Sequence, residues 1–331
     1  MKTVSIIIPM YNVARFLETC VMSVLDQEID HTELEVLMID DGSPDESREV
    51  AGQLAEKYAF IKVFSQKNKG LGGARNTGME HATGKYIVFL DADDILLPKS
   101  LSKLIVLAEN HNLDILEFGA QLIDEEGNVL STVSKDSDAA VYTGIEYYAK
   151  IKYMNSACNK LYSTQFINDH DLQFTEKIYR EDFEFNTRSF FHAKRIMATK
   201  VLGASFLQSS NSITRNKNKK AKDKYIEDYT KSLQLIEDFR NSQTLDKDNS
   251  ATSKYFDERM AVSNLGLFYY MFKNNYSFKA MSEKRKELKK DSLYLDSFKV
   301  SEGRFEKFRV VMLKNFYLFS LTQPLKKALS L

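Results

Sequence analysis

Five short apolar runs in the first 120 residues constrain the fold of this chain most strongly. The runs are continuous and do not alternate with polar residues, which favours strands buried on both faces, as in a parallel sheet. Segments with helical patterning lie between them, so strand and helix alternate along the chain. This order predicts an α/β sandwich. The expected strands are Val4–Pro9, Leu34–Asp40, Ile61–Ser65, Tyr86–Leu90 and Asp114–Gly119.

Helices are expected in the intervening segments. Residues 14–25 carry apolar side chains at helical spacing, and Asn12 is the expected N-cap. The SPDE sequence at 43–46 has the cap residue, the proline and the glutamate of a capping box, which predicts a helix start there. Two further helices are expected at Ala74–Ala82 and from Pro98 to about His111.

The second half of the chain has a different pattern. Residues 121–220 are mixed, whereas the chain from about Lys222 onward is helical in pattern. Residues 216–224 (NKNKKAKDK) are polar and basic and resemble an exposed linker. One helical face is expected to carry Tyr225, Tyr229, Leu233 and Ile236.

Composition excludes several classes of protein. The chain has 46 basic and 46 acidic residues, and this balance argues against a chain-wide nucleic-acid binder. Its two cysteines, Cys20 and Cys158, cannot build a disulfide framework or a four-cysteine zinc site. No stretch is apolar enough to span a membrane, and too few residues precede Val4 for a signal peptide. A cytoplasmic location is therefore expected, with peripheral membrane contact left open.

Acidic residues follow two of the expected strands. Asp40 and Asp41 end one strand, and Asp91 and Asp93 directly follow another. The carboxyl ends of strands in open α/β sheets are where ligands bind. Asp91 and Asp93 are suitable oxygen ligands for a hard divalent cation that bridges phosphates. The alternative is that these acidic turns simply cap helices.

A glycine-rich segment, NKGLGGARN at 68–76, opens a helical pattern. A helix N-terminus beside an arginine suits an anionic phosphate. The segment lacks the Lys-Ser/Thr ending of a Walker loop. It also departs from GxGxxG, because Arg75 occupies the last glycine position. Taken alone, this segment is a weak indication of phosphate binding.

Four motifs in this order resemble the N-terminal domain of family 2 glycosyltransferases of the GT-A fold. They are SIIIPMYN, VLMIDDGSPDES, NKGLGGARNTG and YIVFLDADD, and the resemblance is strong over residues 3–120. It continues more weakly through CNKLY, IYREDFEF and SITR. The resemblance implies a Rossmann-like nucleotide-sugar-binding domain followed by a mainly helical C-terminal region. The implied domains are a catalytic one at 1–220, with a nucleotide-sugar half (1–120) and an acceptor half (121–220), and a helical region at 221–331.

The resemblance also implies roles for individual residues. Asp182 matches the general base and Glu181 its neighbour, while Asp93, with Asp91, would hold Mn²⁺ or Mg²⁺ in a DxD motif. Asp91 would also reach the ribose or the sugar. The implied nucleotide contacts are Pro9 and Tyr11 around the uracil, Asp41 on its N3–H, and Asn68 and Arg75 on the nucleotide or diphosphate. Without the other motifs, Glu181 and Asp182 would be interpreted as a solvated helix start.

The implied reaction is an inverting, metal-dependent transfer of a sugar from a UDP-sugar to a hydroxyl of a glycan or lipid-linked acceptor. Surface polysaccharide, teichoic acid or glycoconjugate assembly is the expected setting. The chain has no Trp and therefore no QxxRW motif, which disfavours the processive membrane synthases. Cys158 stands where many relatives have Trp, and it is expected to be a buried small residue.

Two other functions remain to be weighed. A sugar-phosphate nucleotidyltransferase would carry a glycine-rich loop after the first strand, where this chain has PMYN. A non-catalytic scaffold of glycosyltransferase-like fold, docking partners through its helical half, is the main alternative. The acidic residues Asp91, Asp93 and Asp182 argue against it.

The C-terminal segment 304–331 has an amphipathic basic pattern. Phe305, Phe308, Met312, Phe316 and Phe319 share one helical face, and basic residues flank it. This pattern suits an anionic membrane surface. Packing on the catalytic domain and a dimer interface are the alternatives.

Overall fold

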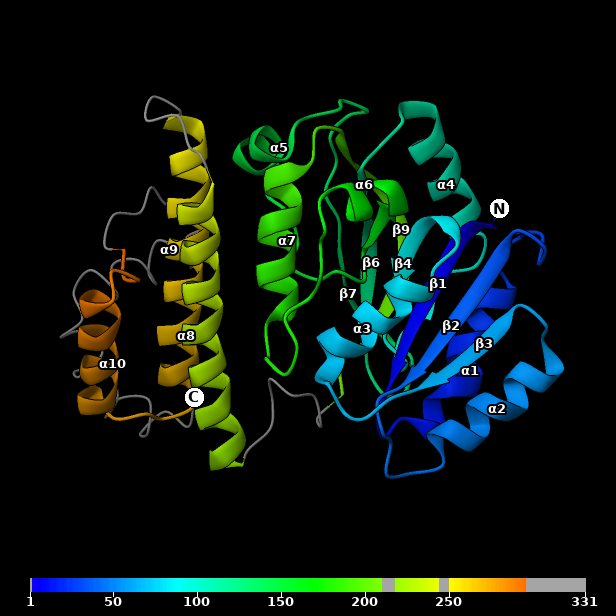
Figure 1. The fold of residues 1–331 in the computed structure, drawn as a ribbon, viewed down its shortest axis with the longest axis horizontal. Coiled ribbons are helices and arrows are strands. Elements are labelled where there is room, and N and C mark those ends of the chain that lie inside the picture. The colour runs from blue at the N-terminus through cyan, green and yellow to red at the C-terminus, as the bar shows by residue number, and fades with distance from the viewer. Residues whose placement is uncertain (1, 210–217, 244–249, 296–331) are drawn as a thin grey trace. The chain divides into compact units, whose positions relative to one another are not determined.

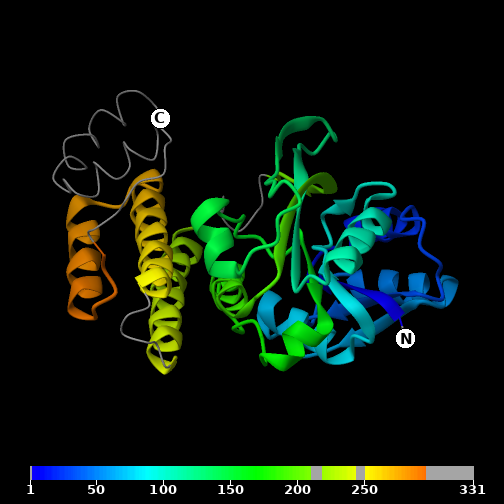
Figure 2. The ribbon, with the colours of Figure 1, turned by 90° about the horizontal axis from the view of Figure 1, so that it is seen from above.

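A computed structural model of the chain describes residues 2–209, 218–243 and 250–295. The chain divides into two compact units, Met1–Arg215 and Asn216–Leu331. Figure 1 and Figure 2 show that strands and helices alternate in the first unit and that the described part of the second contains helices α8 to α10.

Among the described residues, nine strands of the first unit form one sheet in the order β3-β2-β1-β4-β8-β6-β9-β5, and β7 pairs with β6. Strands β1 to β4 are parallel where they pair, and β8 joins β4 to β6 in antiparallel fashion. The strands are β1 (Lys2–Met10), β2 (Leu34–Asp40), β3 (Ile61–Ser65), β4 (Gly84–Phe89), β5 (Ile95–Leu96), β6 (Ile115–Ile123), β7 (Val129–Val133), β8 (Lys160–Ser163) and β9 (Ile196–Leu207).

Strand β1 shows why its apolar run is continuous. Val4, Ile6 and Ile8 belong to the core cluster that includes buried side chains of helices α1 (Ala14–Leu25), α2 (Ser47–Lys57) and α4 (Ser100–His111). Ile7 faces the opposite side, against Gly78 of helix α3 (Gly70–His81). Both faces of the central strands are therefore covered, as the continuous runs predicted.

The helices of the first unit flank this sheet (Figure 1). They are α1 (Ala14–Leu25), α2 (Ser47–Lys57), α3 (Gly70–His81), α4 (Ser100–His111), α5 (Gly144–Lys150), α6 (Thr164–Asp169) and α7 (Glu181–His192). All five expected strands are present, within a few residues of the expected bounds.

Four helix starts differ from the sequence prediction, one of them that of α4, which begins at Ser100 and not at Pro98. The N-cap of α1 is Val13 and not Asn12, and α2 begins at Ser47 without the expected capping box. The reason is that Asp45 serves both helices: its carboxylate accepts hydrogen bonds from the amides of Ala14 (3.0 Å) and Ser47 (3.2 Å). Helix α3 starts at Gly70, four residues before the expected start.

The second unit contains α8 (Lys219–Ser242), α9 (Ser250–Lys273) and α10 (Phe278–Lys290) among its described residues. As expected, the face of α8 that carries Tyr225, Tyr229, Leu233 and Ile236 is buried. The expected linker at 216–224 is wrong from Lys219 onward, because those residues form the first turns of α8. The Asn218 side chain caps this helix by accepting from the amide of Lys220 (2.9 Å).

The basic segment 304–331 lies outside the described residues, so its expected membrane, packing or dimer role stays a prediction. Within the described ranges, each helix is too short or too polar to cross a lipid bilayer.

Candidate active site

The carboxyl end of β4 carries three acidic residues in close succession. A backbone turn closes here, since the Asp94 amide donates to the Asp91 carbonyl (2.9 Å). The buried Asp94 carboxylate accepts from the amide of Leu207 on β9 (2.8 Å) and so ties the two strands together. Asp91 and Asp93 are only partly buried. Burial, reinforced by the charge of Asp91, raises the pKa of Asp93.

The guanidinium of Arg75 is the centre of the site. Arg75 lies on α3, and its side chain is 1% exposed. It donates to Asp91 after β4 (2.8 Å), to Glu181 of α7 (3.1 Å) and to Asp182 of α7 (2.5 Å). One cation therefore joins three carboxylates that are far apart in the sequence.

The acidic groups in this cluster outnumber its basic group, Arg75. Burial opposes the charged form of Arg75, but the neighbouring carboxylates, with Asp182 and Asp91 the strongest, outweigh it and raise the pKa of Arg75. Burial raises the pKa of Glu181 to about 8, with Asp182 adding to the rise and Arg75 opposing it. This environment favours the protonated form of Glu181. The cluster holds excess acidic groups even with Arg75 charged.

Asp182 is fixed at both carboxylate oxygens. Its Oδ1 accepts from Arg75, and its Oδ2 accepts from the amide of Ala157 (3.0 Å). Its side chain nevertheless remains 23% exposed. The residue before the pair, Arg180, occupies the N-cap of α7 with a left-handed φ of 71°. A carboxylate that is held in place and still open to solvent suits proton acceptance from a bound hydroxyl.

Asp41, at the end of β2, holds the loop that leads into α3. Its carboxylate accepts from the Gln66 side chain (2.7 Å) and from the amides of Lys69 (2.7 Å) and Gly70 (2.8 Å). Its carbonyl accepts from the side-chain amide of Asn68 (3.0 Å). Both side chains thus bind the protein's own loop, and the expected base contact of Asp41 and nucleotide contact of Asn68 stay predictions.

Pro9 and Tyr11 lie at the end of β1, next to β2. The amide of Asp41 donates to the carbonyl of Met10 (2.9 Å), which places this strand end beside Asp41. Pro9 is buried, whereas Tyr11 is 53% exposed. An exposed ring at this edge is free to stack on a ligand, and the expected uracil contact stays a prediction.

The glycine-rich segment packs closely against a second stretch of the chain. A Cβ at Gly72 would lie 2.6 Å from the carbonyl oxygen of Thr175, and Gly70 has a positive φ of 77°. Asn76 exchanges two hydrogen bonds with the backbone of Phe174, one in each direction (2.8 and 2.7 Å). Helix α3 and the stretch at residues 174–177 are thus held together just before Glu181 and Asp182.

This arrangement bears on the expected role of Arg75. Its guanidinium is buried among carboxylates and lies near the rings of Phe174 (5.2 Å) and Phe89 (5.9 Å). Its expected contact with the nucleotide or diphosphate stays a prediction. In this structure, Arg75 is committed to positioning Asp91, Glu181 and Asp182.

Sequence reasoning missed the Ala157 amide, which fixes the candidate base Asp182 together with Arg75, and the buried Lys160 close to it. The Ala157 amide belongs to the backbone and has no residue-type signature. Lys160 is fully buried, and its only sequence signal is its place in the weak CNKLY match. Cys158 is buried, as expected, and burial raises the pKa of its thiol, which disfavours a nucleophilic role.

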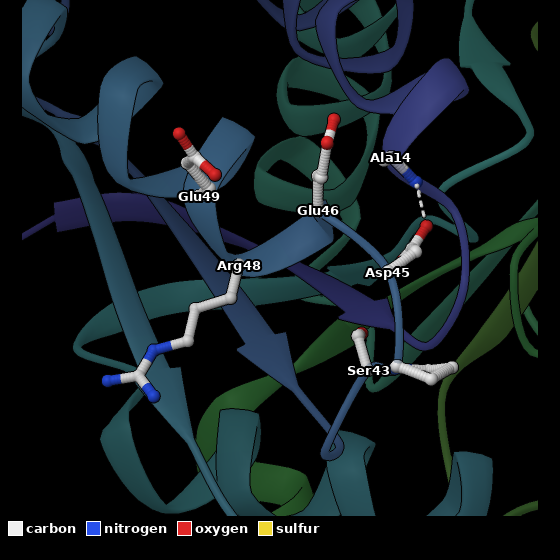
Figure 3. A pocket seen from close by; sticks show the side chains of 7 residues that line it. Ala14, Ser43, Asp45, Glu46, Arg48 and Glu49 are labelled. Carbon is white, nitrogen blue, oxygen red and sulfur yellow. Dashed lines mark hydrogen bonds between the residues drawn. The ribbon is translucent and has the colours of Figure 1, made fainter.

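A separate open pocket lies between the N-termini of α1 and α2 (Figure 3). It is lined by Ala14, Ser43, Pro44, Asp45, Glu46, Arg48 and Glu49. Figure 3 shows Asp45 bonded to the backbone of Ala14. None of the carboxylates around Arg75 lines this pocket, so it is not the candidate catalytic centre.

Asp91 and Asp93 fit a divalent cation in their chemistry. Both are hard oxygen donors, and their partial exposure leaves room for water or phosphate oxygens as further ligands. Within the described ranges, no cluster of three or more His, Cys, Asp or Glu side chains is placed to hold a metal by itself. A cation at Asp91 and Asp93 would therefore depend on oxygens from a substrate and from water.

The model of the family described as glycosyl transferase family 2 matches residues 5–183 of this chain, more than half of its length. The chain belongs to glycosyltransferase family 2. The matched span includes Arg75, Asp91, Glu181 and Asp182, and thus the whole carboxylate cluster.

Two bacterial proteins similar to this chain are described as uncharacterized glycosyltransferases. EpsJ of Bacillus subtilis is 33% identical over 68% of this chain and 66% of its own length. YibD of Escherichia coli is 30% identical over 70% of both chains. The chain thus spans about two thirds of the length of each.

Solved structures of glycosyltransferases share the fold. S. aureus TarS 1–349 in complex with UDP-GlcNAc has a TM-score of 0.67 at 20% identity, covering 98% of this chain and 89% of that one. The mannosyltransferase PcManGT of Pyrobaculum calidifontis, in complex with GDP-Man and Mn²⁺, has a TM-score of 0.56 at 14% identity, covering 98% and 86%. The predicted GT-A fold with a helical C-terminal region is confirmed.

Proposed function

We propose that this family 2 member is a metal-dependent, inverting glycosyltransferase. It transfers a sugar from a UDP-sugar to a hydroxyl of a glycan or lipid-linked acceptor in surface polysaccharide or teichoic acid assembly. Family membership supports the transferase class. The complex of TarS with UDP-GlcNAc, a neighbour in fold, supports a uridine donor.

The observation that carries the proposal is the state of Asp182. Arg75 and the Ala157 amide hold its two oxygens, and its side chain remains partly exposed. A hydroxyl is a poor nucleophile near neutral pH, and a positioned carboxylate accelerates its attack by accepting its proton. Among the three described carboxylate partners of Arg75, Asp182 combines two fixed oxygens with partial exposure of its side chain.

The reaction follows from this placement. The acceptor oxygen forms a bond to the anomeric carbon as the bond from that carbon to the diphosphate breaks. Asp182 takes the proton of the hydroxyl, and UDP departs with the electron pair of the broken bond. A single in-line displacement inverts the carbon, so a UDP-α-sugar gives a β-linked product.

Asp93 and Asp91 are the residues that would hold Mn²⁺ or Mg²⁺. The cation supplies positive charge beside the diphosphate, where negative charge accumulates as UDP departs. The fold neighbour PcManGT in complex with GDP-Man and Mn²⁺ supports a divalent cation at such a donor site. Asp91 also binds Arg75, so the same residue connects the donor side to the candidate base.

The donor nucleotide is expected at the ends of β1 and β2. Tyr11 offers an exposed ring beside the buried Pro9, and Asp41 fixes the loop of Asn68. The Asp41 carboxylate accepts three hydrogen bonds, and a carboxylate has about four acceptor positions. One position therefore remains for a donor such as the uracil N3–H.

The proposal also assigns a role to each of three parts of the chain. Residues 1–120 bind the nucleotide sugar, residues 121–220 supply the base and the acceptor site, and residues 221–331 serve as a helical contact region. The protein is proposed to work in the cytoplasm, with a lipid-linked acceptor presented at the inner face of the membrane.

The test is a thermal-shift screen of UDP-glucose, UDP-galactose, UDP-GlcNAc, UDP-GalNAc and GDP-mannose, each with and without Mn²⁺. A ligand that binds the folded state raises the melting temperature. We expect stabilisation by UDP and by one UDP-sugar, dependent on Mn²⁺ and absent in Asp93→Ala. Stabilisation by GDP-mannose alone would contradict the uridine donor. No response to any nucleotide would favour the non-catalytic scaffold.

A further inference from the structure

The segment Met154–Ala157, just before β8, is held at every residue by groups from elsewhere in the first unit. The Met154 amide donates to Glu117 of β6 (2.9 Å), and the Asn155 carbonyl accepts from Asn186 of α7 (2.7 Å). The segment ends at the Ala157 amide, which donates to Asp182. A loop with its backbone fixed in this way presents that last N–H in a defined direction.

Lys160 supplies the remaining bonds. The residue is fully buried, and its ammonium donates to the carbonyls of Met154 (2.8 Å) and Ser156 (2.6 Å) and to the Asn159 side chain (2.9 Å). An ammonium has three N–H donors, and three acceptors surround this one. Burying such a charge costs several kcal/mol unless hydrogen bonds compensate. Two of the three compensating hydrogen bonds go to the segment that ends at the Ala157 amide, which binds the candidate base.

We propose that Lys160 is a positioning residue for the transfer reaction: through the carbonyls of Met154 and Ser156 it directs the Ala157 N–H at the Asp182 carboxylate. This inference rests on the proposed function, because it takes Asp182 as the base. It adds a residue that is not expected to touch either substrate.

The physical consequence of losing the ammonium is local. Two partly buried carbonyls would lose a charged donor. A fully buried polar group left without a partner costs about 1–3 kcal/mol, which is the upper limit here. The segment would shift to recover solvent or other donors, and the Ala157 N–H would move with it. Asp182 would then keep Arg75 and lose its second fixed partner. A displacement of about 1 Å in a catalytic group costs about 10²-fold in rate.

The test compares Lys160→Met with Glu35→Gln in the full-length protein. Both substitutions remove one buried charge with a side chain of similar size. Glu35 is a suitable control because it lies at the opposite end of the sheet, where it binds Ser5, Thr83 and Lys62. Two readouts apply: hydrogen–deuterium exchange of the peptide that contains residues 154–157, and UDP release from whichever of the four UDP-sugars the unmodified protein turns over.

We expect Lys160→Met to speed exchange in that peptide and to lower kcat by about 10–100-fold, with KM for the UDP-sugar changed less than about twofold. Glu35→Gln should lower the melting temperature and leave both readouts unchanged. A purely structural role for Lys160 would lower stability and leave kcat at its original value, and that result would overturn the proposal. Unchanged exchange at 154–157 would overturn it as well.

Two further arms keep the test decisive. If Lys160→Met fails to fold, Lys160→Gln keeps two N–H donors for the two carbonyls and should give a smaller loss of kcat in the same direction. If the unmodified protein turns over no UDP-sugar, the proposed function fails. The exchange comparison then decides separately whether Lys160 holds the segment.

Discussion

Two buried charged clusters lie at opposite ends of the same parallel strands. They differ in how well cations and hydrogen-bond donors match their acidic groups. At the amino end, the Glu35 carboxylate accepts from the hydroxyls of Ser5 (2.6 Å) and Thr83 (2.9 Å), from the Thr83 amide and from Lys62 (3.2 Å). At the carboxyl end, Arg75 faces three carboxylates, with Asp93 and Asp94 close behind in the sequence.

The difference indicates which cluster serves only the fold. Glu35 is one acid among donors that satisfy it, and burial, which would raise its pKa, is outweighed by hydrogen bonds that lower it. The carboxyl-end cluster has more acids than cations, and burial raises the pKa of Glu181 there. Excess buried charge of one sign is costly, and it is found mainly where a site binds a cation or moves a proton.

The largest effect is expected from the same carboxylate-to-amide change made at the two ends. Asp182→Asn should bind UDP normally but lose about 10²–10⁴-fold in transfer, because an amide cannot accept the acceptor proton. Glu35→Gln should transfer at the original rate. Radiolabel transfer, with UDP affinity measured by calorimetry, checks both. Full activity in Asp182→Asn would place the base elsewhere and remove the contrast between the clusters.

Arg75→Met tests whether the carboxyl-end cluster needs the positive charge of Arg75 for stability. Removing one partner of a buried ion pair leaves uncompensated charge and costs about 3–5 kcal/mol. We expect a loss of this size in the free energy of unfolding, measured with urea. Lys62→Met, at the amino end, should cost far less, because the Lys62 side chain is 50% exposed. Equal losses at the two ends would show that the clusters are alike.

Asp93→Ala should lower Mn²⁺-supported turnover by about 10²–10³-fold, the range seen when one electrostatic contact to the developing charge is lost. The fold itself should survive, since Asp93 is only partly buried and Asp94 makes the structural bond to β9. Turnover at graded Mn²⁺ concentrations, with circular dichroism as the control for folding, checks this. Unchanged turnover would remove Asp93 from the metal site.

The smallest effect is a difference in pH dependence. The pKa of Glu181 is raised from 4.5 to about 8, so its folded form holds a proton that the unfolded form has released. The resulting stability is present below about pH 4.5 and is lost as the pH rises toward 8. The pKa of Glu35 is lowered, so its contribution is present above pH 4.5 and is lost as the pH falls.

Urea unfolding between about pH 2 and pH 9 checks both signs, because the contribution of Glu35 is lost only below its unfolded pKa of 4.5. Glu181→Gln should flatten the decline toward alkaline pH, and Glu35→Gln should flatten the decline toward acid. A parallel shift of the whole curve in both variants would contradict the difference in ionisation between the two clusters.

The sequence predicted the sheet better than the site. Continuous apolar runs located five of the nine described strands, because burial on both faces leaves a direct trace in residue type. The runs did not mark β5, β7, β8 and β9, which lie beyond the parallel strands β1 to β4. The start of α2 was missed because Asp45 binds the amide of Ala14 from another helix, and such a contact is tertiary. The same holds for Arg75: the sequence placed its guanidinium at the nucleotide or diphosphate, whereas its three carboxylate partners come from distant segments and are tertiary contacts.

The convergence of Asp91 with Asp182 was predictable only through the family resemblance, because ninety positions separate them. The hydrogen bond from the Ala157 amide to Asp182 had no such support from the resemblance. Lysine is normally exposed, and nothing in its neighbours' residue types marks Lys160 as buried. Its role emerges only from the carbonyls that surround it.

The paired hydrogen bonds between Asn76 and Phe174 also set a limit on engineering. New acceptor specificity is commonly sought by grafting the second half of a catalytic domain from a relative. Here such a graft would separate the residues at 174–177 from the α3 turns against which they fit, including Gly72. A functional chimera should therefore transplant residues 69–76 together with residues 121–220.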